Sequence, residues 1–135
     1  MVYGLMEVGD HFKGRGKCST FGDAADVQSG QDNGIGCTGF STVQNPLSPY
    51  VALPIPIWHA LKLKGFERVT IQFGSGRVRG FLADKGPNVG LARIVDCSPE
   101  ILRLLGAKTD DQVTVYIKPS EIVPASERYM SARLG

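Results

Sequence analysis

Two short apolar runs that each end on an aspartate constrain the fold of this 135-residue chain more than any other feature. Residues 77–83 form a strand-like run that ends at Asp84, where a Lys-Gly-Pro-Asn turn breaks the chain. Residues 92–95 form a second run that ends at Asp96, and Ser98 then opens a helix. Each aspartate alone also suits a plain turn or capping role. Because strand ends present functional side chains on a rigid scaffold, we expect the pair to converge on one site.

Strand patterns recur along the chain. Residues 67–73 alternate with period two, with Val69, Ile71 and Phe73 on one face. The Gly-Ser-Gly turn at 74–76 makes this segment the antiparallel partner of residues 77–83. Seventeen glycines suit a barrel with many tight turns better than a helical bundle. Further strands are expected over residues 14–21, 50–53 and 112–117.

Two short helices are expected between these strands. The first covers residues 54–65, with Pro56 in the first turn and Gly65 as the C-terminal cap. The second begins after Ser98, a good N-cap, and ends at Gly106.

The segment from residue 22 to residue 49 reads as one long polar loop. Loops of this length inside a small domain are usually functional or disordered. We favour a functional loop that borders the site at the strand ends.

The order and spacing of these motifs resemble the double-psi β-barrel of the rare lipoprotein A, expansin and barwin group. The resemblance covers roughly residues 14–118. It implies an all-β fold with minor α content, a six-stranded double-psi β-barrel with one or two short helices. Residues 1–13 would then form an N-terminal arm and residues 119–135 a C-terminal extension. The motifs are Gly16-Lys-Cys-Ser-Thr-Phe-Gly-Asp23, Gly34-Ile-Gly-Cys-Thr-Gly39, Tyr50-Val-Ala-Leu-Pro54, Asp84-x-Gly-Pro-Asn88, Ile94-Val-Asp96-x-Ser98-Pro99 and Gln112-Val-Thr-Val-Tyr-Ile117.

The resemblance also implies a function. In peptidoglycan lytic transglycosylases of this group, the aspartate that matches Asp84 is the catalytic acid and base, and the one that matches Asp96 supports it. A carboxylic acid donates a proton near neutral pH only where an apolar wall or a nearby negative charge favours its protonated form. Phe81, Leu82 and the charge of Asp96 are the candidates for that environment. We therefore expect Asp84 and Asp96 to be catalytic, with no metal and no cofactor.

The expected substrate contacts come from the first strand, the long loop and the first helix. Thr20, Asp23 and residues 32–34 should border a groove that the two aspartates share, and Trp58 should stack on a sugar ring. The predicted substrate-binding residues are Thr20, Asp23, Asp32, Asn33, Trp58 and Asn88.

A second function class stays open beside the enzyme. The histidine of the bacterial lytic branch has no match in residues 50–54, and Gly86 stands where relatives carry a tyrosine of the site. Expansins share this fold and loosen wall polymers without hydrolysis. The alternative is therefore a non-catalytic glycan-binding or wall-loosening module. A third, weaker interpretation is a structural component of a virion or secretion machine.

Composition and charge set the expected partners. The net charge is +2, and no Lys/Arg cluster is interleaved with aromatic residues, so we expect no nucleic-acid partner. No apolar run approaches the roughly 20 residues of a membrane helix. The resemblance implies a peptidoglycan or other wall-polysaccharide partner and export to the periplasm or extracellular space. The first residues lack a signal-peptide pattern, so either a leader is absent from this sequence or the protein is an exception to the export that the resemblance implies.

The three cysteines are Cys18, Cys37 and Cys97. An odd number leaves at least one free thiol, and their spacing matches no metal-binding pattern. We expect all three to be reduced and packed in the interior. Cys18 and Cys37 are the first pair to consider for a disulfide.

Overall fold

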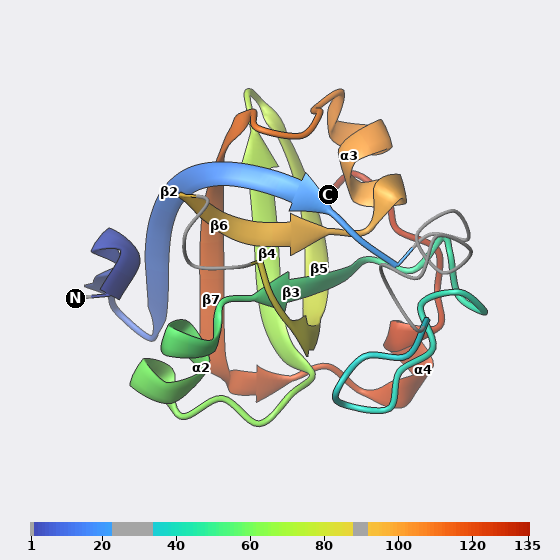
Figure 1. Ribbon diagram of the computed structural model, residues 1–135, viewed down its shortest axis with the longest axis horizontal. Coiled ribbons are helices and arrows are strands. Elements are labelled where there is room, and N and C mark those ends of the chain that lie inside the picture. Colours follow the sequence, from blue (N-terminus) through green and yellow to red (C-terminus); the bar gives the residue numbers. More distant parts are fainter. Residues whose placement is uncertain (1, 23–33, 88–91) are drawn as a thin grey trace.

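The computed structural model describes residues 2–22, 34–87 and 92–135 (Figure 1). Seven strands form one sheet in the order β1-β2-β6-β3-β5-β4-β7, and a further pairing of β2 with β7 closes six of them into a barrel. The strands are β1 (Met6–Val8), β2 (His11–Thr20), β3 (Tyr50–Leu53), β4 (Glu67–Phe73), β5 (Gly76–Lys85), β6 (Arg93–Cys97) and β7 (Gln112–Ile122). The helices are η1 (Val2–Gly4), α2 (Ile55–Leu61), α3 (Pro99–Leu105) and α4 (Ala125–Arg128).

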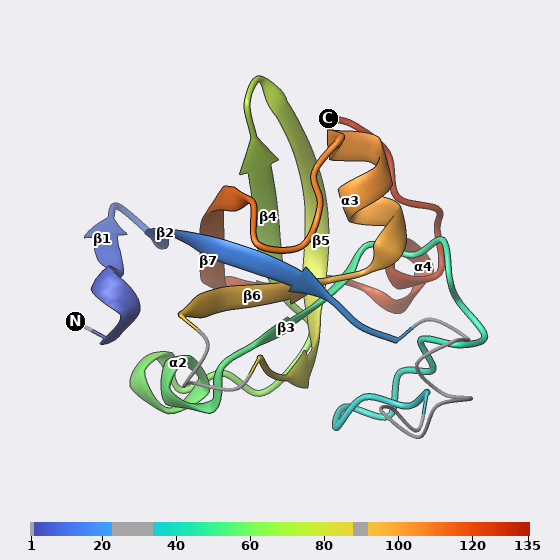
Figure 2. The ribbon, with the colours of Figure 1, turned by 45° about the horizontal axis from the view of Figure 1, so that its top comes forward.

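The strand pairings give the barrel an approximate two-fold symmetry. Two pairs are parallel, β2 with β6 and β3 with β5. The pairs β3–β6, β4–β5, β4–β7 and β2–β7 are antiparallel. Exchanging the first three barrel strands, β2, β3 and β4, with the last three, β5, β6 and β7, returns the same set of pairings. Two interlocked halves of this kind are the double-psi arrangement that the sequence predicts, and Figure 2 shows β2, β6 and β3 crossing one side of it.

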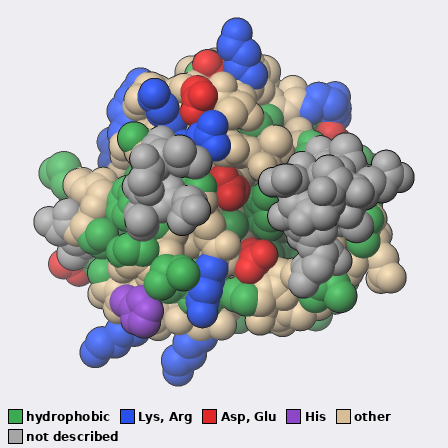
Figure 3. Space-filling model, in the orientation of Figure 1, with side chains coloured by type: hydrophobic (Ala, Val, Ile, Leu, Met, Phe, Trp, Pro, Cys, Tyr) green, Lys and Arg blue, Asp and Glu red, His purple; other side chains and the backbone are tan. Residues whose placement is uncertain are grey.

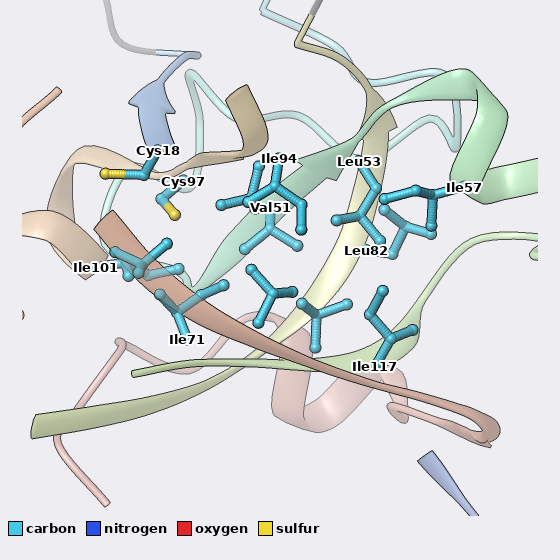
Figure 4. Close-up of a cluster of buried hydrophobic side chains, with 14 of the residues drawn as sticks. Cys18, Val51, Leu53, Ile57, Ile71, Leu82, Ile94, Cys97, Ile101 and Ile117 are labelled. Carbon is cyan, nitrogen blue, oxygen red and sulfur yellow. The ribbon is translucent and has the colours of Figure 1, made fainter. Parts of the chain in front are cut away.

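The core lies inside the barrel and follows the period-two patterns of the strands. Val69 and Ile71 of β4 are fully buried, and the alternate residues Thr70 and Gln72 are not. The predicted hairpin is present, because Phe73 pairs with Gly76 across the turn. In Figure 4 the side chains of Ile71, Leu82, Ile101 and Ile117 point into one cluster.

The second helix has the predicted ends. The Ser98 side chain accepts a hydrogen bond from the Ile101 N–H at 3.3 Å, and Gly106 caps α3 in the left-handed conformation. The first helix is shorter than predicted: α2 ends at Leu61 rather than Gly65. Lys62 already adopts the left-handed conformation, with φ 54°, and stops the helix there. None of the helices in the described segments is long and apolar enough to cross a membrane.

Both ends of the chain are held against the barrel. At the N-terminal end β1 pairs with β2, which already begins at His11. At the C-terminal end β7 continues to Ile122, and the Val123 side chain behind it is buried against aromatic residues. Ordered structure therefore extends beyond residues 14–118 in both directions.

Candidate functional site

Asp84 and Asp96 lie in one row of side chains across four strands. Ser19 of β2 pairs with Asp96 of β6, Asp96 pairs with Ala52 of β3, and Ala52 pairs with Asp84 of β5. Paired residues on neighbouring strands point to the same face of a sheet. The row therefore presents Ser19, Asp96, Ala52 and Asp84 on the outer face of the barrel. Both aspartates are half-buried.

This aspartate row sits on the approximate two-fold axis of the barrel. Exchanging the two halves turns the pair Ser19–Asp96 into the pair Asp84–Ala52 and leaves the pair Asp96–Ala52 in place. The first half supplies the small residues of the row, and the second half supplies both acids. The space-filling view shows acidic side chains near the middle of the face formed by β3 and β6 (Figure 3).

Asp84 is held by backbone N–H groups from two directions. Its Oδ1 accepts hydrogen bonds from the Cys37 N–H at 2.9 Å and from the Lys85 N–H at 2.8 Å. Thr38 binds the same loop to β5, because its hydroxyl donates a hydrogen bond to the Ala83 carbonyl at 2.8 Å. At Gly36 a Cβ would lie 2.3 Å from that carbonyl oxygen, so only glycine allows this approach. Residues 36–38 thus form a loop clamp on the end of β5.

Asp96 reaches over the backbone that follows Asp84. A Cβ built on Gly86 would lie 3.1 Å from Oδ2 of Asp96 and 3.9 Å from the Cβ of Ala52. Gly86 also has φ 146°, a conformation that side chains rarely adopt. Position 86 is therefore restricted to glycine by its conformation and by the closeness of Asp96.

The cysteines divide into two buried thiols and one exposed thiol. Cys18 and Cys97 lie at one end of the core cluster (Figure 4), and Cys37 is exposed in the loop clamp. All three are free, so the disulfide considered between Cys18 and Cys37 does not form. The prediction that Cys37 packs in the interior is wrong, because its side chain is exposed beside Asp84 at the end of β5.

Cys37 reports on the charge of Asp84. Burial raises the pKa of the Cys37 thiol, and the neighbouring Asp84 carboxylate raises that pKa further, while Lys85 lowers it. In an Asp84→Asn variant the negative charge is gone, so the pKa of Cys37 should fall and more thiolate should be present at a given pH. We expect faster reaction of the native protein with a thiol reagent, measured at a fixed pH below the pKa of the thiol.

The matched control is Cys37→Ser, which should lose the native reaction and keep the two slow thiols that react only on unfolding. An unchanged native rate in Asp84→Asn would show that Asp84 does not act on the thiol.

Trp58 lies close to the site but is largely buried. It is 8% exposed, and the Lys85 ammonium sits 5.3 Å from the centre of its ring. Its Nε1 is buried without a hydrogen-bond partner among the described residues. Little of the ring is left for the sugar stacking predicted from the sequence. Phe40, the aromatic residue that follows the loop clamp, is likewise buried at 3% exposed and packs against Tyr50 and Phe81.

Of the remaining predicted substrate contacts, only Thr20 belongs to the described residues, and it does not lie on the outer face of the aspartate row. Thr20 pairs with Cys97, one position beyond the aspartate row, so its side chain lies on the core side, and its hydroxyl is buried without a described partner. Ser19 takes the place on the outer face that the sequence analysis gave to Thr20. The predictions for Asp23, Asp32, Asn33 and Asn88 fall outside the described residues.

The two carboxylates of the site offer hydrogen-bond acceptors. Neither aspartate lines any of three surface cavities formed by the described residues. Within residues 2–22, 34–87 and 92–135, no three His, Cys, Asp or Glu side chains gather in a way that would hold a metal ion. Two carboxylates across a small alanine are suited to proton transfer and to binding hydroxyl groups.

Three parts of the candidate site were not predicted from the sequence: Ser19, Ala52 and the loop clamp. Ala52 carries no chemical signal, because its role depends on its position between two distant strands. The glycines in and around the loop clamp were a signal in the sequence, but only the fold shows that Gly36 lies against the Ala83 carbonyl.

Comparisons with known proteins support no family assignment. No family model matches the sequence, and no curated protein matches it. Among solved structures, the computationally designed protein msDPBB_sym2 is similar, with 19% sequence identity and a TM-score of 0.48. That match covers 76% of this chain and 95% of the designed chain. The description of the fold therefore rests on the strand pairings themselves.

Proposed function

We propose that the protein acts on a cell-wall glycan, with peptidoglycan as the substrate, as a lytic transglycosylase-like enzyme whose acid and base is Asp84. The observation that carries the proposal is the register that sets Asp84 and Asp96 on either side of Ala52. The proposal also draws on the motif resemblance of residues 14–118. Its substrate lies outside the cytoplasmic membrane, so the protein would work in the periplasm or extracellular space.

The proposed reaction needs one proton donor that later takes the proton back. Asp84 gives its proton to the glycosidic oxygen as the bond from that oxygen to the anomeric carbon breaks. The 6-hydroxyl of the same sugar then bonds to the anomeric carbon, and Asp84 accepts the hydroxyl proton. The product is a 1,6-anhydro sugar, and no water is consumed. Both backbone N–H groups bind Oδ1 of Asp84, so Oδ2 would carry the proton.

Asp96 has a supporting role in this scheme. Its carboxylate accepts a hydrogen bond from a sugar hydroxyl and so holds the glycosidic oxygen beside Asp84 for proton transfer. Gly86 has no side chain and lies beside Asp96, so a sugar ring can approach the backbone at that position.

Glycan binding without cleavage is the second candidate. The two N–H hydrogen bonds to Asp84 are ones that an ionised carboxylate accepts well. In this version both aspartates accept hydrogen bonds from sugar hydroxyls, and no bond breaks.

Incubation with purified, insoluble peptidoglycan distinguishes the two candidates. Mass spectrometry of the soluble fraction should find anhydro-muropeptides, while sedimentation measures how much protein stays on the polymer. Sedimentation without soluble products would support the binding module. Neither products nor sedimentation would contradict both.

A further inference from the structure

The barrel carries a basic surface on the strands opposite the aspartate row. β4 and β7 cross behind β3 and β6 in Figure 1, and their outward side chains continue onto β2 and β5. Two adjacent rows make up this surface, which we call the basic sheet face. The first row is Arg15, Thr114, Gln72 and Arg77, and the second is Lys13, Tyr116, Thr70 and Arg79.

Cations on this face repeat along the strands. Lys13 and Arg15 are two residues apart on β2, and Arg77 and Arg79 are two residues apart on β5. Residues two apart on a strand lie roughly 6.8 Å from each other on the same face. All four side chains are exposed. The face therefore presents two short columns of regularly spaced positive charge.

Acidic side chains on this part of the barrel are already paired. Glu121 lies within salt-bridge distance of Arg68, Arg79 and Lys118, and Asp10 lies 3.2 Å from Lys118. Lys13, Arg15 and Arg77 form no salt bridge with any residue that the structure describes. A shallow cavity of about 360 Å³ lies among these charges, lined in part by Arg77, Arg79 and Tyr116.

The Tyr116 ring, the one aromatic ring within the two rows, is already covered by neighbouring side chains, and the His11 ring lies 5.9 Å from it. Arg77 lies 5.2 Å and Lys13 lies 5.7 Å from the centre of the Tyr116 ring. The Tyr116 hydroxyl shares the Gln72 side-chain oxygen with Arg77, at 3.1 Å and 2.9 Å. Proteins that hold single-stranded nucleic acid use aromatic rings that are free to stack on bases. This face therefore offers charge contacts and no free stacking platform.

We propose that the basic sheet face binds a linear phosphodiester polymer without bases, of the polyol-phosphate kind, through Lys13, Arg15, Arg77 and Arg79. The charges are complementary, and their repeat along each strand suits a chain with regularly spaced phosphates. The face is separate from the aspartate row, so the proposal does not depend on glycan cleavage. The prediction of no nucleic-acid partner rested on the lack of a Lys/Arg cluster interleaved with aromatic residues in the sequence. The fold gathers basic residues around Tyr116 from separate strands, and the prediction stays a prediction.

The test measures binding of fluorescent poly(glycerol phosphate) at several salt concentrations by anisotropy. Three to four released counterions give a slope of about −2 to −3 for the logarithm of affinity against the logarithm of salt concentration. The triple variant Lys13→Gln, Arg15→Gln, Arg77→Gln should lose most of the binding and flatten the slope by about 2. The control Lys62→Gln, Lys64→Gln, Lys108→Gln makes the same change in net charge elsewhere and should bind like the original protein.

Oligothymidylate with the same number of phosphates tests the choice of polymer. Charge contacts alone predict that it binds no more tightly than poly(glycerol phosphate), and that Tyr116→Phe changes neither affinity. Tighter binding of oligothymidylate would overturn the proposal in favour of nucleic acid. Absence of binding, or equal loss in the two triple variants at unchanged melting temperatures, would overturn it altogether.

Discussion

Replacing Asp84 by asparagine should abolish the release of soluble glycan products. The amide keeps the shape of the side chain and can still accept from the Cys37 and Lys85 N–H groups, but it cannot deliver a proton to the leaving oxygen. General acid catalysis contributes about 10²- to 10⁴-fold, so the rate should fall by at least that order. The measurement is the initial rate of anhydro-muropeptide release from purified peptidoglycan.

Two further variants serve as comparisons for the rate of Asp84→Asn. Asp96→Asn should lower the rate less, because Asp96 acts through orientation rather than by giving the proton. Asp10→Asn removes an exposed carboxylate that pairs with Lys118 on the opposite face of the barrel, and it should leave the rate unchanged. Equal rates for Asp84→Asn and the original protein would remove Asp84 from the reaction. Sedimentation with the polymer should stay intact in all three variants.

Replacing Ile117 by alanine should cost the most stability of the substitutions considered. Ile117 of β7 is fully buried in the barrel core, so its loss leaves a cavity that neighbouring strands cannot close. Such substitutions destabilise by about 2–5 kcal/mol, a large share of the free energy of unfolding of a small domain. Urea denaturation should show a lower midpoint with an unchanged slope.

Ile122→Ala on the same strand is the matched control. Its side chain is 53% exposed, so the same chemical change should cost less than about 1 kcal/mol. Similar losses in the two variants would mean that residues on the inner face of β7 are not the core of the barrel.

The parts of the fold that depend on local patterns were predictable. Alternation in residues 67–73 and the glycines after it encode the β4–β5 hairpin, and Ser98 with Gly106 encodes both ends of α3. The end of α2 was not predictable from composition, because Lys62 rather than a glycine takes the left-handed conformation. Local chemistry permits several end points for a helix, and packing selects one.

The candidate site was predictable only in its acids. Asp84 and Asp96 stand out because each ends an apolar run, but Ala52 between them has no signal of its own. Register between strands that are distant in sequence decides which residues share a face, and one step moves a side chain to the other side. This is why Ser19, and not Thr20, joins the row. The burial of Trp58 likewise depends on how α2 packs, which helical periodicity does not specify.

A double-mutant cycle of Asp84→Asn and Asp96→Asn tests most directly whether the two aspartates act as one site. The quantity measured is the initial rate of anhydro-muropeptide release for the original protein, both single variants and the double variant. If Asp96 works mainly through Asp84, the double variant should be little slower than Asp84→Asn alone, because the effects of coupled residues do not add. Losses that multiply in the double variant, or an Asp96→Asn variant as fast as the original protein, would contradict the shared site.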